Sequence, residues 1–223
     1  MKEGYFFKRN KELTNYNSEL LRYELGQREV RTLRSLAQLY GISLSGFKDK
    51  RILDLGCADQ HVKKPLEEQG GKYIGLDIED LNFETDSLPI QDNSIDVVMS
   101  LAVIEHIHNP EIFLNEIYRV LKPGGFVYLS TPNFKLCFKD FYNDCTHVKP
   151  YTPESLEMVL GIFNFQNPQT FPGLRCKPNW YYTGKYRFFK ASKLLPFNGD
   201  QKFAPSFLKG KATSIFAIGT KAG

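Results

Sequence analysis

Two short apolar runs, each ending in an acidic residue, constrain the fold of this chain more than any other feature. Residues 51–59 read Arg-Ile-Leu-Asp-Leu-Gly-Cys-Ala-Asp, which predicts a buried strand that runs into a tight turn at Gly56. A glycine at that turn lets the backbone come close to a ligand. The second run, residues 73–77, ends at Asp77, about 20 residues after Gly56, a spacing typical of a carboxylate that accepts hydrogen bonds from ribose hydroxyls. Together the two runs predict a nucleoside-containing cofactor.

The residues of the turn exclude two familiar phosphate-binding loops. A dinucleotide-binding loop needs a third small residue after Gly56 and Ala58, and this chain has His61 there. A P-loop needs Gly-Lys-Ser/Thr, which the turn lacks. Residues 54–60 instead resemble the first motif of class I S-adenosylmethionine-dependent methyltransferases, an acidic residue followed by three alternate glycines. Ala58 and Gln60 replace two of these glycines, and Gln60 stands where a glycine-specific backbone angle is expected. A strand, turn and helix without a ligand is the alternative.

Three further blocks resemble the same family, in the same order. They are the stretches from Leu88 to Ser100, from Leu101 to Ile107 and from Pro110 to Gly125. With the first motif they cover roughly residues 50–133. The resemblance implies S-adenosyl-L-methionine as the cofactor and methyl transfer as the activity.

The pattern of apolar residues predicts an α/β fold without the resemblance. Residues 95–99 are mostly apolar, as in a strand that is buried on both faces. Residues 112–121 repeat apolar side chains at helical spacing, and a strand resumes at residues 126–129. Strand, helix and strand alternate in this way over residues 51–131, which favours a parallel sheet with helices on both faces. We expect a Rossmann-like, seven-stranded, mostly parallel sheet with an antiparallel C-terminal strand.

The chain is long enough for one domain with a substantial core. We expect a single methyltransferase domain over residues 1–223, divided into an N-terminal helical cap (1–48), a cofactor-binding half (49–133) and a substrate-side half (134–223). Apolar spacing between residues 11 and 42 predicts one or two amphipathic helices. The resemblance makes Tyr16, Arg22 and Tyr23 candidates for cofactor contacts there, with ordinary packing as the alternative. Residues 213–220 predict the final strand.

Composition bounds the partners and the compartment. The net charge is +4 with dispersed basic residues, so nucleic acid is not an expected partner. The four cysteines have neither C-x-x-C pairing nor metal-ligand spacing and indicate thiols in a reducing compartment. No apolar run approaches the roughly 20 residues that cross a bilayer, and the first residues lack the apolar core of a signal peptide. We expect a cytoplasmic protein, and the oligomeric state stays open.

Residues 180–195 combine aromatic with basic side chains and allow three interpretations. They form a lid over the substrate, a helix packed on the sheet, or a surface helix that contacts anionic lipid. Gly184 weakens any helix through this segment by about 1 kcal/mol. We favour a lid or a packing element over membrane contact.

The resemblance assigns a role to each residue of the expected cofactor site. Asp77 holds the ribose, the backbone of the turn meets the methionine portion, and residues after the next strand line its edge. An acidic residue before Leu88 meets the adenine amino group, where Asp86 is favoured over Glu84. The expected cofactor-binding residues are Asp54, Gly56, Cys57, Ala58, Asp77, Ile78, Asp86, Leu101 and Ala102.

The acceptor side is predicted from residues 142–156. They resemble an element of methyltransferases found with polysaccharide and O-antigen biosynthesis, and the loop leaves the sheet edge where ligands bind in open α/β folds. Within the loop, His147 is the expected catalytic base for a hydroxyl, with Asp144 orienting it. In the alternative, both side chains only brace the loop.

The sequence does not support a metal site. Glu105 and His106 suggest a metal site, but no third ligand follows at suitable spacing, so we expect none. The predicted function is therefore methylation of a hydroxyl on a sugar or glycan intermediate. Two alternatives stay open: a methyltransferase for a quinone or another small molecule, and a non-catalytic protein that binds S-adenosylmethionine.

Overall fold

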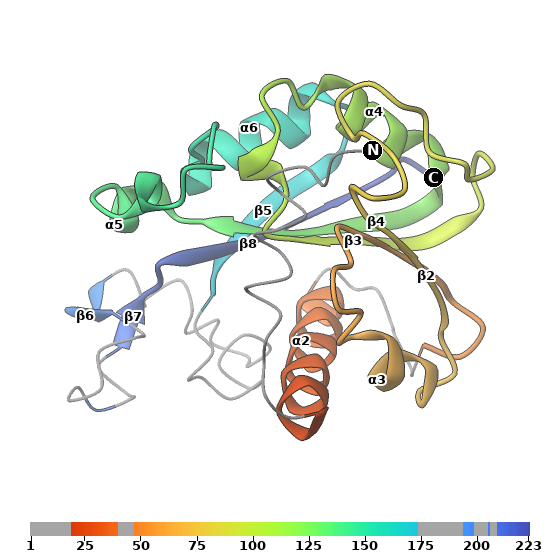
Figure 1. Cartoon of the computed structure of the whole chain (residues 1–223), viewed down its shortest axis with the longest axis horizontal. Helices are drawn as coiled ribbons and strands as arrows, with labels where there is room; N and C mark the ends of the chain where they lie inside the picture. Colours follow the sequence, from red (N-terminus) through yellow and green to blue (C-terminus); the bar gives the residue numbers. More distant parts are fainter. Residues whose placement is uncertain (1–18, 40–46, 174–193, 199–204, 206–208) are drawn as a thin grey trace.

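The computed structural model describes residues 19–39, 47–173, 194–198, 205 and 209–223 of the chain (Figure 1). Six strands form the main sheet in the order β2-β1-β3-β4-β8-β5. Their bounds are Arg51–Leu55 for β1, Lys72–Leu76 for β2, Ile95–Leu101 for β3, Leu121–Pro132 for β4, Gln166–Pro172 for β5 and Ser214–Thr220 for β8. Strands β1 to β4 are parallel, and β8 runs antiparallel between β4 and β5. The predicted α/β class and the antiparallel C-terminal strand are confirmed.

The helices lie on both faces of the sheet, as predicted. Helices α2 (Glu19–Leu39) and α3 (Lys63–Glu67) lie on one face, and α4 (Glu111–Val120) and α6 (Pro153–Ile162) lie on the other (Figure 1). The remaining short elements are the 3-10 helices η1 (Ile104–His106) and η2 (Phe141–Asn143), helix α5 (Phe134–Cys137), and the small strand pair β6 (Phe197–Asn198) and β7 (Lys209–Lys211). None of the described helices has the length and hydrophobicity needed to cross a bilayer.

The sheet and its connections differ from the expectation at two points. It has six strands within the described residues instead of seven, and the connection from β2 to β3 contains no helix. That connection, residues 77–94, is held in turns by its own side chains: Asp86 accepts a hydrogen bond from the backbone of Asn82, and the Asn82 side chain accepts one from the backbone of Glu84. Such local bonds compete with helix and strand formation. The regular alternation of strand and helix is therefore interrupted at this point.

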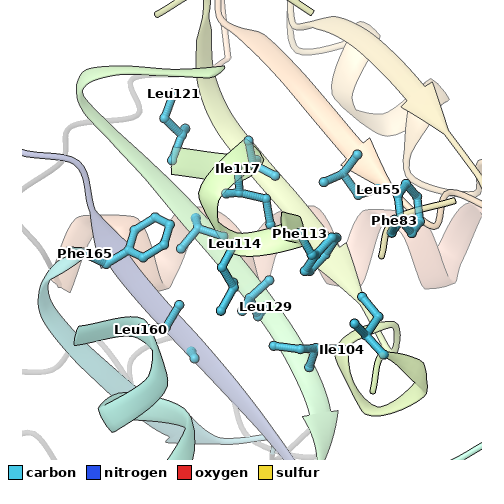
Figure 2. Packing of buried hydrophobic residues seen from close by; sticks show 14 of the residues in the cluster. Leu55, Phe83, Ile104, Phe113, Leu114, Ile117, Leu121, Leu129, Leu160 and Phe165 are labelled. Atoms are coloured by element: carbon cyan, nitrogen blue, oxygen red, sulfur yellow. The ribbon is translucent and has the colours of Figure 1, made fainter. Parts of the chain in front are cut away.

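Each central strand supplies side chains to two separate cores. Along β1, Ile52 packs with helices α2 and α3, while Leu53 packs with helices α4 and α6. Successive side chains of a strand point to opposite faces of the sheet, so neighbouring buried residues of each strand enter different cores. Figure 2 shows the second core, where Phe113, Leu114 and Leu160 pack on the sheet. Burial on both faces explains why these strands are apolar throughout.

A capping box fixes the start of helix α6. The Thr152 hydroxyl accepts a hydrogen bond from the Ser155 backbone at 3.2 Å, and Ser155 Oγ accepts one from the Thr152 backbone at 2.8 Å. Pro153 occupies the first turn, where its missing N–H costs nothing. This cap ends the polar loop that follows β4 and holds that loop at the carboxyl edge of the sheet.

Candidate active site

The turn after β1 has the left-handed backbone of a glycine-rich loop although it has only one glycine. Gly56 has φ +77°, Ala58 φ +40° and Gln60 φ +53°. Hydrogen bonds fix the turn against the neighbouring strand, since the Gly56 backbone donates to the Leu76 carbonyl at 2.8 Å. Non-glycine residues adopt this conformation at a cost of about 1–3 kcal/mol each. The geometry that Gln60 put in question is therefore present.

The segment after β3 lies against this turn. A Cβ on Gly56 would overlap the Val103 side chain, so this side chain fills the space that any residue other than glycine would need. The preceding residues, Leu101 and Ala102, sit at the same edge, and Ala102 is exposed with φ +57°. The sequence had singled out Leu101 and Ala102, but no local signal pointed to Val103. Its contact depends on tertiary structure.

Asp77 connects β2 to the same turn. Its Oδ2 accepts a hydrogen bond from the Ala58 backbone at 2.8 Å, and its Oδ1 accepts one from the Ile78 backbone at 2.7 Å. A carboxylate has about four acceptor positions, so these two bonds leave capacity for the two hydroxyls of a ribose. Ile78 is exposed beside it. The structure thus brings together Asp77, Ala58 and Ile78, which the sequence named separately.

Asp54 lies beneath the turn as a buried acid. It is 4% exposed, and the Tyr73 hydroxyl donates to its Oδ2 at 2.8 Å. Burial raises the pKa of Asp54 to about 6, against the Tyr73 hydrogen bond that favours its charged form. Burial, together with the charge of Asp54, also raises the pKa of the Cys57 thiol to about 12. Cys57 is therefore a protonated packing residue next to Asp54.

The raised pKa of Asp54 predicts a measurable pH dependence of stability. Because the folded state holds the proton more tightly than the unfolded chain, the free energy of unfolding should fall as the pH rises from about 4 to above 6. The expected loss is about 2–3 kcal/mol. Asp54→Asn should remove it, so the variant gains stability relative to wild type between pH 4 and pH 7 in urea unfolding.

Asp49→Asn is the matched control for this experiment. Asp49 is exposed and pairs with Lys72 at 3.4 Å, and a surface pair of this kind contributes little. Its stability difference from wild type should be nearly the same at both pH values. An Asp54→Asn difference that also stays constant between pH 4 and pH 7 would contradict the assignment.

The two candidates for the adenine contact have other partners. Asp86 is fully exposed and closes the turn of residues 82–86, and the Asn82 backbone hydrogen bond lowers its pKa. Glu84 Oε1 accepts a hydrogen bond from the His108 backbone at 3.0 Å and so ties the turn to the segment before α4. The sequence could not reveal these roles, because each depends on the folded path of the 77–94 connection.

His147 and Asp144 meet in the loop after β4. His147 Nε2 lies 3.5 Å from Asp144 Oδ2, and both side chains are mostly buried. His147 Nδ1 lies 2.7 Å from the Phe141 carbonyl, and the His147 ring packs on the Phe141 ring. The Asp144 Oδ1 accepts hydrogen bonds from the backbone and the hydroxyl of Thr146. The two side chains are therefore adjacent, within a hydrogen-bond network that braces the loop.

This loop packs on η1. The backbone N–H groups of Val148 and Lys149 both donate to the Glu105 carbonyl, and the His106 and His147 rings are 4.9 Å apart. The Glu105 carboxylate is buried and accepts a hydrogen bond from Thr131 at 3.0 Å. Glu105, His106 and His147 each bring a potential ligand atom within 4.8 Å of the others. No third potential metal ligand follows Glu105 and His106 at a suitable spacing in the sequence, but the fold brings His147 to them from a distant loop.

The N-terminal helix contacts the edge of the cofactor turn. Arg22 pairs with Asp59 at 3.7 Å, and the Tyr23 hydroxyl donates to Glu68. Arg22 therefore reaches the turn itself, while Tyr23 packs on α3. Tyr16 lies outside the described residues, as does nearly all of the 180–195 segment.

Comparison with known proteins identifies the family of the chain. A family profile for a methyltransferase domain matches residues 25–170. The ubiquinone biosynthesis O-methyltransferase of Maricaulis maris is 31% identical over 107 residues, which cover 39% of this chain and 42% of that protein. The mitochondrial ubiquinone biosynthesis O-methyltransferase of Rattus norvegicus is 31% identical over 182 residues, which cover 64% and 52%. The chain thus spans about two fifths to one half of the length of these curated relatives.

The solved structures support the fold. An S-adenosylmethionine-dependent methyltransferase from Archaeoglobus fulgidus superposes with a TM-score of 0.55 at 20% identity, covering 87% of this chain and 94% of that one. Both O-methyltransferases above are named for ubiquinone rather than for polysaccharide biosynthesis, so the resemblance holds at the level of the superfamily. Because the family match covers more than half of the sequence, the chain belongs to the methyltransferase domain family, whose methyl donor is S-adenosylmethionine.

Proposed function

We propose that this chain transfers the methyl group of S-adenosylmethionine to a hydroxyl oxygen of a small-molecule acceptor. The proposed class of acceptor rests on the sequence similarity of this chain to two O-methyltransferases of ubiquinone biosynthesis. This replaces the sugar or glycan intermediate as the first candidate. The oxygen as the methylated atom agrees with the titratable pair in the loop after β4.

The cofactor half of the proposal rests on the turn of residues 56–60 and on Asp77. Asp77 receives the ribose hydroxyls, and the left-handed turn presents backbone to the methionine portion. Leu101 and Ala102 line the open edge beside Gly56. These roles follow the family motif residue by residue, and each of these residues lies at the carboxyl edge of β1, β2 or β3.

The acceptor half rests on the pair of His147 and Asp144. The sulfonium makes the methyl carbon electrophilic, so the protein has to align the acceptor oxygen and remove its proton. As the oxygen–methyl bond forms and the sulfur–methyl bond breaks, the hydroxyl proton passes to the pair. Its two side chains are 3.5 Å apart and partly shielded from water.

A glycan hydroxyl is the second candidate. The observation in its favour is the resemblance of residues 142–156 to an element of methyltransferases found with polysaccharide biosynthesis. Both candidates share the cofactor half and the hydroxyl chemistry, so they differ only in the acceptor that the enzyme accepts.

The test is methyl transfer from radiolabelled S-adenosylmethionine to two acceptor panels, one of small polyhydroxylated aromatics and one of oligosaccharides. We expect label in the aromatic panel. Asp77→Ala should weaken binding of S-adenosylhomocysteine at least tenfold in titration calorimetry, since losing a charged hydrogen-bond acceptor costs about 1.5–3 kcal/mol.

Asp80→Ala is the matched control for Asp77→Ala. Asp80 is exposed and its carboxylate accepts a hydrogen bond from the Asp77 backbone at 2.7 Å, so the variant loosens the same turn without removing the ribose acceptor. Its affinity should stay within a few-fold of wild type. Label only in oligosaccharides would replace the first candidate by the second, and unchanged affinity in Asp77→Ala would refute the cofactor site.

A further inference from the structure

Glu105, His106 and His147 form a cluster of ligand-type side chains between η1 and the loop after β4. One potential ligand atom from each lies within 4.8 Å of the other two. Glu105 is 1% exposed, and the two histidines are partly buried. The cluster therefore combines two imidazoles with one carboxylate, and two segments about 40 residues apart contribute to it.

The hydrogen bonds of His106 determine where its proton is. Nδ1 lies 3.0 Å from the Thr146 carbonyl and 2.9 Å from the Thr146 hydroxyl oxygen. That hydroxyl donates its own proton to Asp144 at 2.7 Å, so it accepts from the imidazole. Both neighbours of Nδ1 are thus acceptors, and Nδ1 must carry the proton. In the neutral ring the lone pair is then on Nε2.

His147 follows the same arrangement. Its Nδ1 lies 2.7 Å from the Phe141 carbonyl, which can only accept, so the neutral ring also has its lone pair on Nε2. Histidines that bind metals almost always donate their other N–H to a carbonyl or a carboxylate, which fixes the tautomer and the ring orientation. Both imidazoles of the cluster already have this second layer of hydrogen bonds.

Tyr151, four residues after His147, is a buried polar side chain. Its side chain is 3% exposed, and its hydroxyl has no hydrogen-bond partner among the described residues. Burial, and to a lesser extent the charge of Glu105, raises the pKa of Tyr151. Buried polar groups without a partner are rare, and a water molecule, an ion or a functional role accounts for them.

We propose that Glu105, His106 and His147 bind one divalent transition-metal ion of the zinc class. Two histidines and one carboxylate make up the ligand set of many catalytic zinc sites and of non-haem iron sites, and they leave a coordination position open. Imidazole ligands disfavour Mg²⁺, which prefers oxygen. The cluster is next to the cofactor turn along the chain, because η1 directly follows Val103, whose side chain a Cβ on Gly56 would meet.

The role of the ion in catalysis rests on the proposed function. A bound divalent ion lowers the pKa of a coordinated hydroxyl, so an acceptor oxygen in the open position loses its proton more readily. His147 is then a ligand, and Asp144, whose Oδ2 is 3.5 Å from His147 Nε2, takes the proton. The oxygen–hydrogen bond breaks, the oxygen–methyl bond forms, and the sulfur–methyl bond breaks in the same displacement.

Titration calorimetry of the chelator-treated full chain with Zn²⁺ tests the site without any assay of activity. We expect one ion per chain, bound more tightly than Mg²⁺. His147→Ala and Glu105→Gln should weaken Zn²⁺ binding more than Thr146→Val, which removes only the second layer and should cost about 10–100-fold. His108→Ala is the control, because His108 is exposed and pairs with Glu84 outside the cluster.

Three results would overturn the site. They are no Zn²⁺ binding by the wild-type chain, equal binding of Mg²⁺, and equal loss of Zn²⁺ binding in His108→Ala and His147→Ala. S-adenosylhomocysteine binding, measured on every variant, shows whether it is folded. It also separates the two proposals, because Zn²⁺ binding without methyl transfer supports the site and contradicts the function, whereas methyl transfer by a chain that binds no Zn²⁺ does the opposite.

Discussion

His147→Ala should lower kcat at least about 100-fold while the affinity for S-adenosylhomocysteine stays near the wild-type value. Assistance by a general base contributes about 10²–10⁴-fold to a rate, and a metal ion held by the same imidazole acts on the same proton. His147 belongs to the loop after β4, whereas the proposed cofactor-binding residues Gly56 and Asp77 lie on the turns after β1 and β2. The change should therefore affect the chemical step and leave cofactor binding intact. The measurement is kcat and cofactor affinity on one preparation.

The melting temperature separates catalysis from loop bracing. The His147 ring packs on Phe141 and its Nδ1 bonds the Phe141 carbonyl, so a purely structural role would lower the melting temperature and cofactor affinity together. His147→Gln is a second variant, since its amide can still donate to that carbonyl but has no base near neutral pH. A fall in kcat of less than tenfold in both variants, with a known acceptor, would exclude His147 from proton transfer.

The fold was predictable wherever buried residues follow a regular pattern along the sequence. Strands β1, β3 and β4 are buried on both faces, so their apolar runs were visible without any partner. Helix α6 was also visible, because Thr152 and Pro153 form a local cap. The 77–94 connection was not predictable in this way. Its turns depend on single hydrogen bonds such as that from the Asn82 backbone to Asp86, which leave no period in the sequence.

The cofactor side and the acceptor side of the candidate site also differ in how far the sequence alone could predict them. Gly56 and Asp77 were found from the sequence because a strand and a turn fix each of them locally. The cluster of Glu105, His106 and His147 was not predicted, because His147 lies far along the chain from Glu105 and His106. Only the hydrogen bonds between η1 and the loop after β4 bring it close. A search by ligand spacing in the sequence cannot detect such a site.

Gly56→Ala should destabilise the fold by about 2–5 kcal/mol and weaken cofactor binding more than tenfold. Two separate costs add here. Forcing alanine into φ +77° costs about 1–2 kcal/mol, and pushing the Val103 side chain aside adds about 1–3 kcal/mol of overpacking. In the proposed function, the displaced turn is also the one that presents backbone to the methionine portion of the cofactor. Urea unfolding and titration with S-adenosylhomocysteine measure the two effects.

Gly124→Ala isolates the first of these costs. Gly124 has φ +74°, nearly the angle of Gly56, but a Cβ there would meet no atom within 4 Å. This variant should lose only about 1–2 kcal/mol and keep its cofactor affinity, because Gly124 lies in the turn at the start of β4, away from the cofactor residues. Val103→Ala supplies the second comparison: in that background Gly56→Ala should cost less, since the methyl group it meets is gone. Equal losses at Gly56 and Gly124 would mean that backbone conformation alone, and not the approach of Val103, requires glycine in the cofactor turn.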